Sequence, residues 1–230
     1  MNYFTFGTKK SYEFGVWISG SFVSPVRDRE MISVPGRSGD LIFDNGRFEN
    51  VTVTYPCFIK ENFRQNFNAL KESLFSDTDY VKLTDTYDKD HFRQGVVVSI
   101  SEPELGKNMD SGEFDVVFNC KPQRFLTSGD KTVTLTGDGS IINPTLFESK
   151  PLIRVYGTGL LTVGSRTVEI TKVSTYVDID CDLEEAYKGS ANCNGNIKVT
   201  DFPAFPSGST GITLGEGITK IIVTPRWYVV

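Results

Sequence analysis

The feature that most limits the possible folds of this chain is that only one stretch has the apolar spacing of an amphipathic helix. In residues 60–75, KENFRQNFNALKESLF, the side chains of Phe63, Phe67, Leu70 and Leu74 recur at intervals that place them on one helical face. Elsewhere, short runs of β-branched and aromatic residues alternate with polar turns, which is typical of strands. The sequence therefore predicts a mainly β protein in which one helix covers a sheet.

Two turn signals lie close together before that helix. VPGRSGD, residues 34–40, contains a Pro-Gly pair suited to a type II turn. The Asn-Gly pair that follows favours a tight hairpin turn, because both positions tolerate positive φ, and it precedes an alternating strand. We expect a hairpin over residues 40–59, which is either an exposed hairpin that can reach a neighbouring molecule or an ordinary internal hairpin. The four tip residues are Asp44, Asn45, Gly46 and Arg47.

The second half of the chain has a different pattern of apolar and polar residues. After the polar stretch LTSGDKT, residues 126–132, β-rich segments follow one another at intervals of about ten residues, and no helical period appears. The sequence therefore predicts two domains. Residues 1–128 are expected to form an α+β N-terminal domain with one main helix, and residues 129–230 an antiparallel β-sandwich of the jelly-roll type.

Composition excludes several functional classes. The 24 basic and 29 acidic side chains leave a net charge of -5, which provides no attraction to phosphate backbones or anionic lipid. We expect no sequence-specific nucleic-acid binding. No apolar run reaches the length of a membrane span, and the N-terminus lacks the apolar core of a secretory signal, so we expect no membrane insertion. The four cysteines are sparse and have no CxxC spacing, so we expect reduced thiols, with Cys181 and Cys193 as the only pair close in sequence.

Catalytic and metal-binding patterns are weak. The single histidine, His91, lies in a polar stretch and is expected to be a solvated loop residue, and no nucleophile, nucleotide or zinc motif occurs. Acid pairs such as Glu184 and Glu185 are expected to be turn residues, although glycoside hydrolysis also uses two carboxylates. Asp178, Asp180 and Asp182 resemble the start of a calcium loop, but the required glycine and glutamate are missing, so an acidic strand edge is expected. We predict no enzyme, no metal and no cofactor.

Three stretches together resemble the distal tail protein (Dit) family of siphophages. They are VPGRSGDLIFDNGRFENVTVTY at residues 34–55, FNCKPQRFLTSG at 118–129, and the C-terminal pattern that begins SKPLIRVYGTGLLTVG and runs over 149–230. The resemblance implies a structural virion protein of the tail tip, assembled in the host cytoplasm. Its N-terminal belt domain would close a hexameric ring around a channel for DNA, and its C-terminal domain would be a galectin-like sandwich. In such a ring the hairpin tip at residues 44–47 would contact an adjacent subunit or a tail partner.

The same resemblance implies the partners of the ring. They are other copies of the chain, the major tail tube protein, a tail-associated lysin or tail-fibre-type protein, and receptor-binding or baseplate proteins. With 230 residues the chain has no room for a large inserted sugar-binding module. This favours a hub whose partner proteins, rather than the hub itself, bind the receptor. The alternative is a β-sandwich carbohydrate-binding module for cell-wall attachment. Trp227 and Tyr228 would then stack on a sugar ring, although aromatics in a C-terminal strand are more often core residues.

Overall fold

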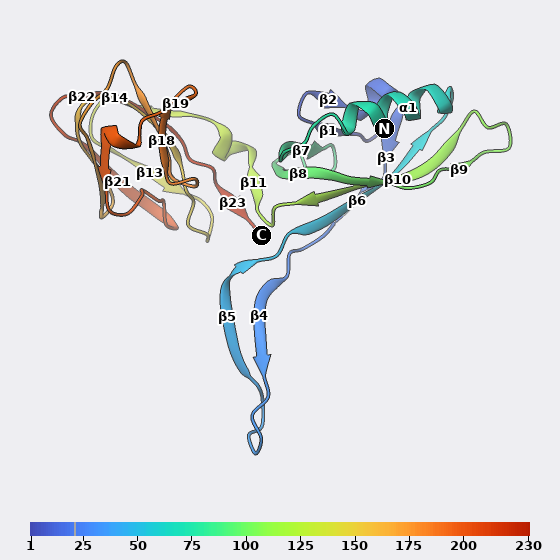
Figure 1. Ribbon diagram of the computed structural model, residues 1–230, viewed down its shortest axis with the longest axis horizontal. Helices are drawn as coiled ribbons and strands as arrows, with labels where there is room; N and C mark the ends of the chain where they lie inside the picture. Colours follow the sequence, from blue (N-terminus) through green and yellow to red (C-terminus); the bar gives the residue numbers. More distant parts are fainter. Residues whose placement is uncertain (21) are drawn as a thin grey trace. The chain divides into compact units, whose positions relative to one another are not determined.

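The computed structural model describes residues 1–20 and 22–230, and the chain divides into two compact units. The first unit comprises Met1–Arg124 together with Val230, and the second comprises Phe125–Val229. Both are built mainly from antiparallel strands, as Figure 1 shows, so the predicted mainly β fold class is confirmed. That residues 1–128 and 129–230 are separate domains with separate roles stays a prediction. Among the described residues, no helix is long and apolar enough to cross a membrane.

The first unit is organised around one sheet, in which the strands run in the order β2-β1-β7-β8-β10-β6-β3. Their bounds are β1 Phe4–Phe6, β2 Lys9–Lys10, β3 Val16–Ile18, β6 Val51–Ile59, β7 Val81–Asp85, β8 His91–Ile100 and β10 Gly112–Cys120, with the short β9, Glu104–Leu105, added to β10. The central pair β6 and β10 alternates strictly between buried and more exposed residues. This alternation places one face of the sheet against the core, because successive side chains of a strand point to opposite sides.

The predicted helix is confirmed as α1, which runs from Phe63 to Leu74. Phe63, Leu70 and Leu74 are buried, and Phe67 packs against the same cluster. The ring of Phe67 meets that of Phe114 on β10 edge to face, with 4.9 Å between centroids. A short 3₁₀ turn, η1, Ser11–Phe14, packs beside the helix. The helical period therefore predicted both the element and the face that it buries.

A separate two-stranded hairpin, β4 (Arg27–Ile32) and β5 (Leu41–Phe48), belongs to the same unit. The Pro-Gly turn is confirmed, because Gly36 has φ of 81° and the Arg37 N–H donates to the Val34 carbonyl at 3.1 Å. The predicted tip at residues 44–47 is wrong, since those residues lie within β5 and the chain reverses at 33–40 instead. Consequently β5 and β6 do not form the expected hairpin over 40–59, and each pairs with other strands.

The Asn-Gly pair fails to form a turn because its conformational freedom is used by a bulge. Gly46 has φ of 74°, and the strand register shifts between Arg27 and Arg29, opposite this segment. The Asp44 carboxylate accepts the Gly46 N–H at 2.8 Å. A glycine with positive φ suits a bulge as well as a tight turn, so the local signal was compatible with both.

The second unit is the predicted antiparallel sandwich. One sheet has the order β12-β22-β14-β17-β18-β19 and the other the order β13-β21-β15-β16-β20. The first comprises β12 Val133–Leu135, β22 Ile218–Thr224, β14 Leu152–Gly157, β17 Val177–Asp180, β18 Glu185–Lys188 and β19 Ala191–Asn192. The second comprises β13 Gly139–Asn143, β21 Gly208–Leu214, β15 Gly159–Val163, β16 Arg166–Ile170 and β20 Ile197–Val199. The remaining elements are β11 Arg124–Leu126, which pairs with β23 Tyr228–Val229, and the 3₁₀ turns η2 Thr127–Asp130 and η3 Asn194–Asn196.

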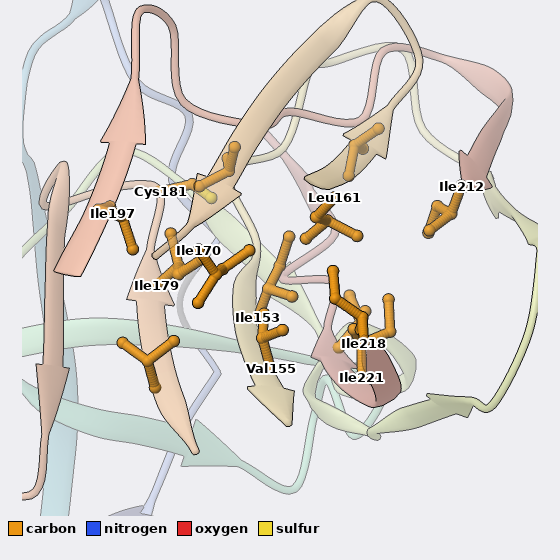
Figure 2. Packing of buried hydrophobic residues seen from close by; sticks show 14 of the residues in the cluster. Ile153, Val155, Leu161, Ile170, Ile179, Cys181, Ile197, Ile212, Ile218 and Ile221 are labelled. Carbon is orange, nitrogen blue, oxygen red and sulfur yellow. The ribbon is translucent and has the colours of Figure 1, made fainter. Parts of the chain in front are cut away.

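The core of the second unit lies between its two sheets. Ile153 and Ile179 from the first sheet and Leu161 and Ile170 from the second are almost completely buried. Figure 2 shows these side chains converging from strands that are far apart in the sequence. Each such residue contributes about 1.5–3 kcal/mol when it is fully buried. The alternation of the strands therefore supplies the stability of this unit, and no long helix is present among its residues.

Candidate functional site

The most unusual surface of the described chain is the β4–β5 hairpin, which we call the arm (residues 27–48). Its outer half carries five large apolar side chains that are 41–63% exposed: Met31, Ile32, Leu41, Ile42 and Phe43. Single exposed apolar residues are normal on a protein surface, but contiguous ones mark an interaction site. These five are contiguous, because Ile32 pairs with Leu41 and Met31 pairs with Ile42 across the two strands.

Apolar side chains occupy both faces of the arm. Cross-strand partners share a face and neighbours along a strand alternate, so Ile32, Leu41 and Phe43 lie on one face and Met31 and Ile42 on the other. In Figure 1 the arm extends away from the sheet of its own unit, and apart from each other its strands pack substantially against no described element. An isolated two-stranded ribbon is at best marginally stable in water. The arm therefore has the composition of a segment that another surface covers on both sides.

Charged side chains hold the base of the arm together. Asp44 accepts hydrogen bonds from Arg27 at 2.8 Å and Arg29 at 3.3 Å. The bond from Arg27 and the one from the Gly46 N–H lower the pKa of Asp44 to about 2. The pair therefore stays ionised at neutral pH, and it fixes the bulged register of the two strands.

Asp28 completes this network on the other strand. It accepts hydrogen bonds from Asn45 at 2.9 Å and Arg47 at 2.6 Å, and these bonds lower its pKa. The structure thus brings the four sequence-predicted residues 44–47 together, but at the base of the arm, where they stabilise its conformation. The apolar residues 31, 32 and 41–43 were missed as a site. The signal that could have found them is the apolar run on each side of the Pro-Gly turn, where a solvated hairpin would carry polar residues.

The proposed sugar-stacking residues occupy different environments. Trp227 is only 6% exposed and packs edge to face on Phe205, with 5.6 Å between ring centroids, so its ring belongs to the core. Tyr228 is half-buried and stacks on Phe147 at 5.5 Å. A sugar ring needs an accessible aromatic face. Trp227 does not present one, which corrects its assignment as a sugar contact.

The aspartates of the calcium-like segment are not an exposed strand edge, which corrects the sequence interpretation. Asp178 and Asp180 are 4% and 3% exposed, and β17 lies between β14 and β18. Arg154 donates two hydrogen bonds to Asp178, at 2.7 and 2.9 Å, and Arg226 donates two to Asp180, at 2.7 and 2.8 Å. Bidentate pairs of this kind satisfy buried carboxylates. No cluster of three potential metal ligands occurs in the part of the chain that the structure describes.

His91 and the cysteines complete the account of reactive groups. His91 is half-buried at the start of β8, with its Nδ1 2.8 Å from Asp88, so its assignment to a solvated loop is wrong. All four cysteines are free thiols, and burial raises the pKa of Cys120 and of Cys181 to about 12. Such thiols are neutral and poorly nucleophilic at neutral pH.

Comparisons with known proteins bear on the fold. No protein-family model matches the sequence, and no curated protein does so. Among solved structures, the Dit protein (gp 19.1) of phage SPP1, described as a paradigm of the hub adsorption apparatus in phages that infect Gram-positive bacteria, matches with a TM-score of 0.74 at 12% identity over 100% of both chains. The activated baseplate of phage p2 also matches. Its form with Sr gives a TM-score of 0.53 at 11% identity over 96% of this chain and 98% of that chain, and its form with Ca gives 0.53 at 11% over 100% of both.

These matches define the class of fold. The full length of the chain, both units included, is similar to a phage hub protein and to a chain of a phage baseplate. The fold of this chain is therefore the one found in these phage proteins.

Proposed function

We propose that this chain is a distal tail protein, a structural subunit of a phage tail tip. In this proposal six copies form a closed ring that joins the tail tube to the adsorption apparatus and leaves an axial channel for DNA. The observation that carries the proposal is the arm, an extended hairpin with uncovered apolar side chains on both faces. The full-length similarity to the SPP1 Dit protein supports it.

The arm suits a ring because it is one patch of the subunit and would bind a different patch on the next subunit. A head-to-tail contact, in which one patch of a subunit binds a different patch of the next, is the kind that closes into rings. A projecting ribbon that binds the body of a neighbour is such a contact. Covering both faces would remove five exposed apolar side chains from water and thereby supply a driving force for association.

The proposed partners follow from the same role. One face of the ring would bind the major tail tube protein, and the other a tail-associated lysin or fibre-type protein, with receptor-binding or baseplate proteins attached at the periphery. The mature protein would reside in the virion after assembly in the host cytoplasm. Because a channel rich in Lys and Arg would retain DNA, we expect an acidic or neutral channel wall.

Purified full-length protein provides the test. Light scattering and native mass spectrometry at micromolar concentration should detect a hexamer, and negative-stain images should show rings with a central opening. If the purified protein is monomeric, the decisive sample is the intact virion. Absence of the chain from rings at the virion tail tip would contradict the proposal, and specific glycan binding by a monomer would favour the carbohydrate-binding alternative.

A further inference from the structure

The first unit contains a cavity that the arm and its proposed role do not explain. It has a volume of about 280 Å³ and is lined by residues of β6, β7 and β8, with residues 22–24 and Arg124 as further walls. Elsewhere the core face of this sheet is apolar and covered by α1. Here it carries Tyr55, Asp85, His91 and Arg93 instead. A polar hollow within a core has to satisfy its charged groups.

The two carboxylates of the cavity already have partners. Asp85 accepts a hydrogen bond from the Tyr55 hydroxyl at 2.6 Å and two more from the backbone N–H groups of Tyr87 and Asp88, at 2.8 and 2.9 Å. The Asp88 side chain pairs with Arg124 and with His91. Burial raises the pKa of Asp88, but the bonds from His91 and Arg124 outweigh it and lower the pKa overall. Neither carboxylate therefore needs a further cation.

Arg93, by contrast, is a half-buried cation that forms no ion pair with any described residue. Its guanidinium donates only to two backbone carbonyls, those of Pro122 at 3.3 Å and Val23 at 3.1 Å. The bond to Pro122 is long, and a guanidinium has five N–H donors, so most of its hydrogen-bonding capacity is unused. Burial lowers the pKa of Arg93, and so does the Arg124 guanidinium, whereas Cys120, Tyr55 and Asp88 act in the opposite direction without reversing the shift. Arginines are rarely buried deeply unless they are paired with an anion, and Arg93 is half-buried with no such partner among the described residues.

We propose that this cavity is an oxyanion site in which the Arg93 guanidinium binds a carboxylate or phosphate group. A planar guanidinium matches the two oxygens of such a group and binds it through parallel hydrogen bonds. The volume is below the ~300–1,000 Å³ of typical small-molecule pockets, so the occupant is a small anion or one acidic side chain. Two sources supply this chemistry, namely a free anion and an acidic side chain from a second copy of the chain. The site does not depend on the proposed ring function.

The site is tested by titrating the chain with sodium phosphate and with sodium acetate. Sodium chloride at equal ionic strength is the control. Thermal denaturation of the wild type should show a saturable stabilisation by phosphate or acetate. Arg93→Gln should bind about tenfold more weakly or worse, because it loses a charge-assisted bidentate contact. The control is Arg64→Gln, which removes the same charge from an exposed position on α1 and should bind like the wild type.

Two further measurements separate the possible outcomes. If Arg93→Gln fails to fold, Arg93→Lys keeps the charge without the planar fork and should bind with intermediate affinity. If an acidic side chain of a second copy fills the site, phosphate will lower the assembled fraction of the wild type in light scattering, whereas a free anion as occupant will leave it unchanged. Equal responses of wild type and Arg93→Gln to phosphate would overturn the proposal. The proposal would also be overturned if phosphate and acetate did not stabilise the wild type and if the wild type and Arg93→Gln assembled equally.

Discussion

Replacing one apolar side chain of the arm should weaken assembly without affecting the fold of the subunit. Ile42 is 63% exposed in the subunit, so Ile42→Ser removes little that is buried in the monomer. Full burial of an isoleucine side chain is worth about 1.5–3 kcal/mol, and roughly 60% of that remains to be gained at an interface. The expected loss is therefore about 1–2 kcal/mol for each subunit contact, or roughly tenfold in its association constant.

A closed ring amplifies this loss because every contact carries the same substitution. Light scattering across a concentration series should show Ile42→Ser assembling only at much higher protein concentration than the wild type. The matched control is Ile142→Ser on β13 of the second unit, since Ile142 is 68% exposed and loses the same side chain. Unchanged melting temperatures would show that both variants fold. If Ile42→Ser and Ile142→Ser assemble like the wild type, the arm is not the contact surface.

Three further predictions concern stability. Leu70→Ala, at a position with no exposure, should lower the free energy of unfolding by about 2–5 kcal/mol in urea titrations, and a change below 1 kcal/mol would contradict the packing of α1. Arg226→Met should lower the free energy of unfolding by roughly 3–5 kcal/mol at neutral pH, because it leaves the buried Asp180 carboxylate without a positively charged partner. Burial raises the Asp180 pKa, but the bonds from Arg226 lower it overall, so this contribution is present above the unfolded pKa of about 3.9 and is lost as pH falls below it. A wild-type melting temperature that stays constant from pH 5 to pH 2 would refute this assignment. Chelator should leave the melting temperature unchanged and mass measurement should find four free thiols, whereas a drop of several degrees or a mass showing a disulfide would contradict the expectation.

Sequence patterns predicted those helices and turns whose conformation depends only on residues close in sequence. The spacing of Phe63, Phe67, Leu70 and Leu74 identified both α1 and its buried face, because a helix places such residues on one side whatever surrounds it. The Pro-Gly turn was predicted for a similar reason, since proline fixes φ and the following glycine accepts positive φ. The Asn-Gly pair shows the limit of this reasoning. Its preference for positive φ is also local, but the choice between a turn and a bulge depended on β4 as a pairing partner.

The candidate sites were less predictable because they depend on residues that are distant in sequence. The pairing of Asp180 with Arg226 joins β17 to the end of the chain, and no spacing rule connects them. Arg93 illustrates the same difficulty, since its contacts with Val23 and Pro122 come from opposite directions along the chain. In the sequence it is one of 24 basic residues, and only its burial without an anion distinguishes it.

The sequence by itself determined the mainly β composition, the single helix and the absence of familiar catalytic motifs. It also determined the change near residue 126 to a pattern of short β-rich segments. These follow from side-chain period and backbone preference, which act over a few residues. The tertiary structure alone decided which apolar side chains remain uncovered on the arm and which charged groups share a cavity. Burial is a property of the whole fold, because a strand of the same composition is covered or exposed according to the strands that pair with it and the layer that packs on it.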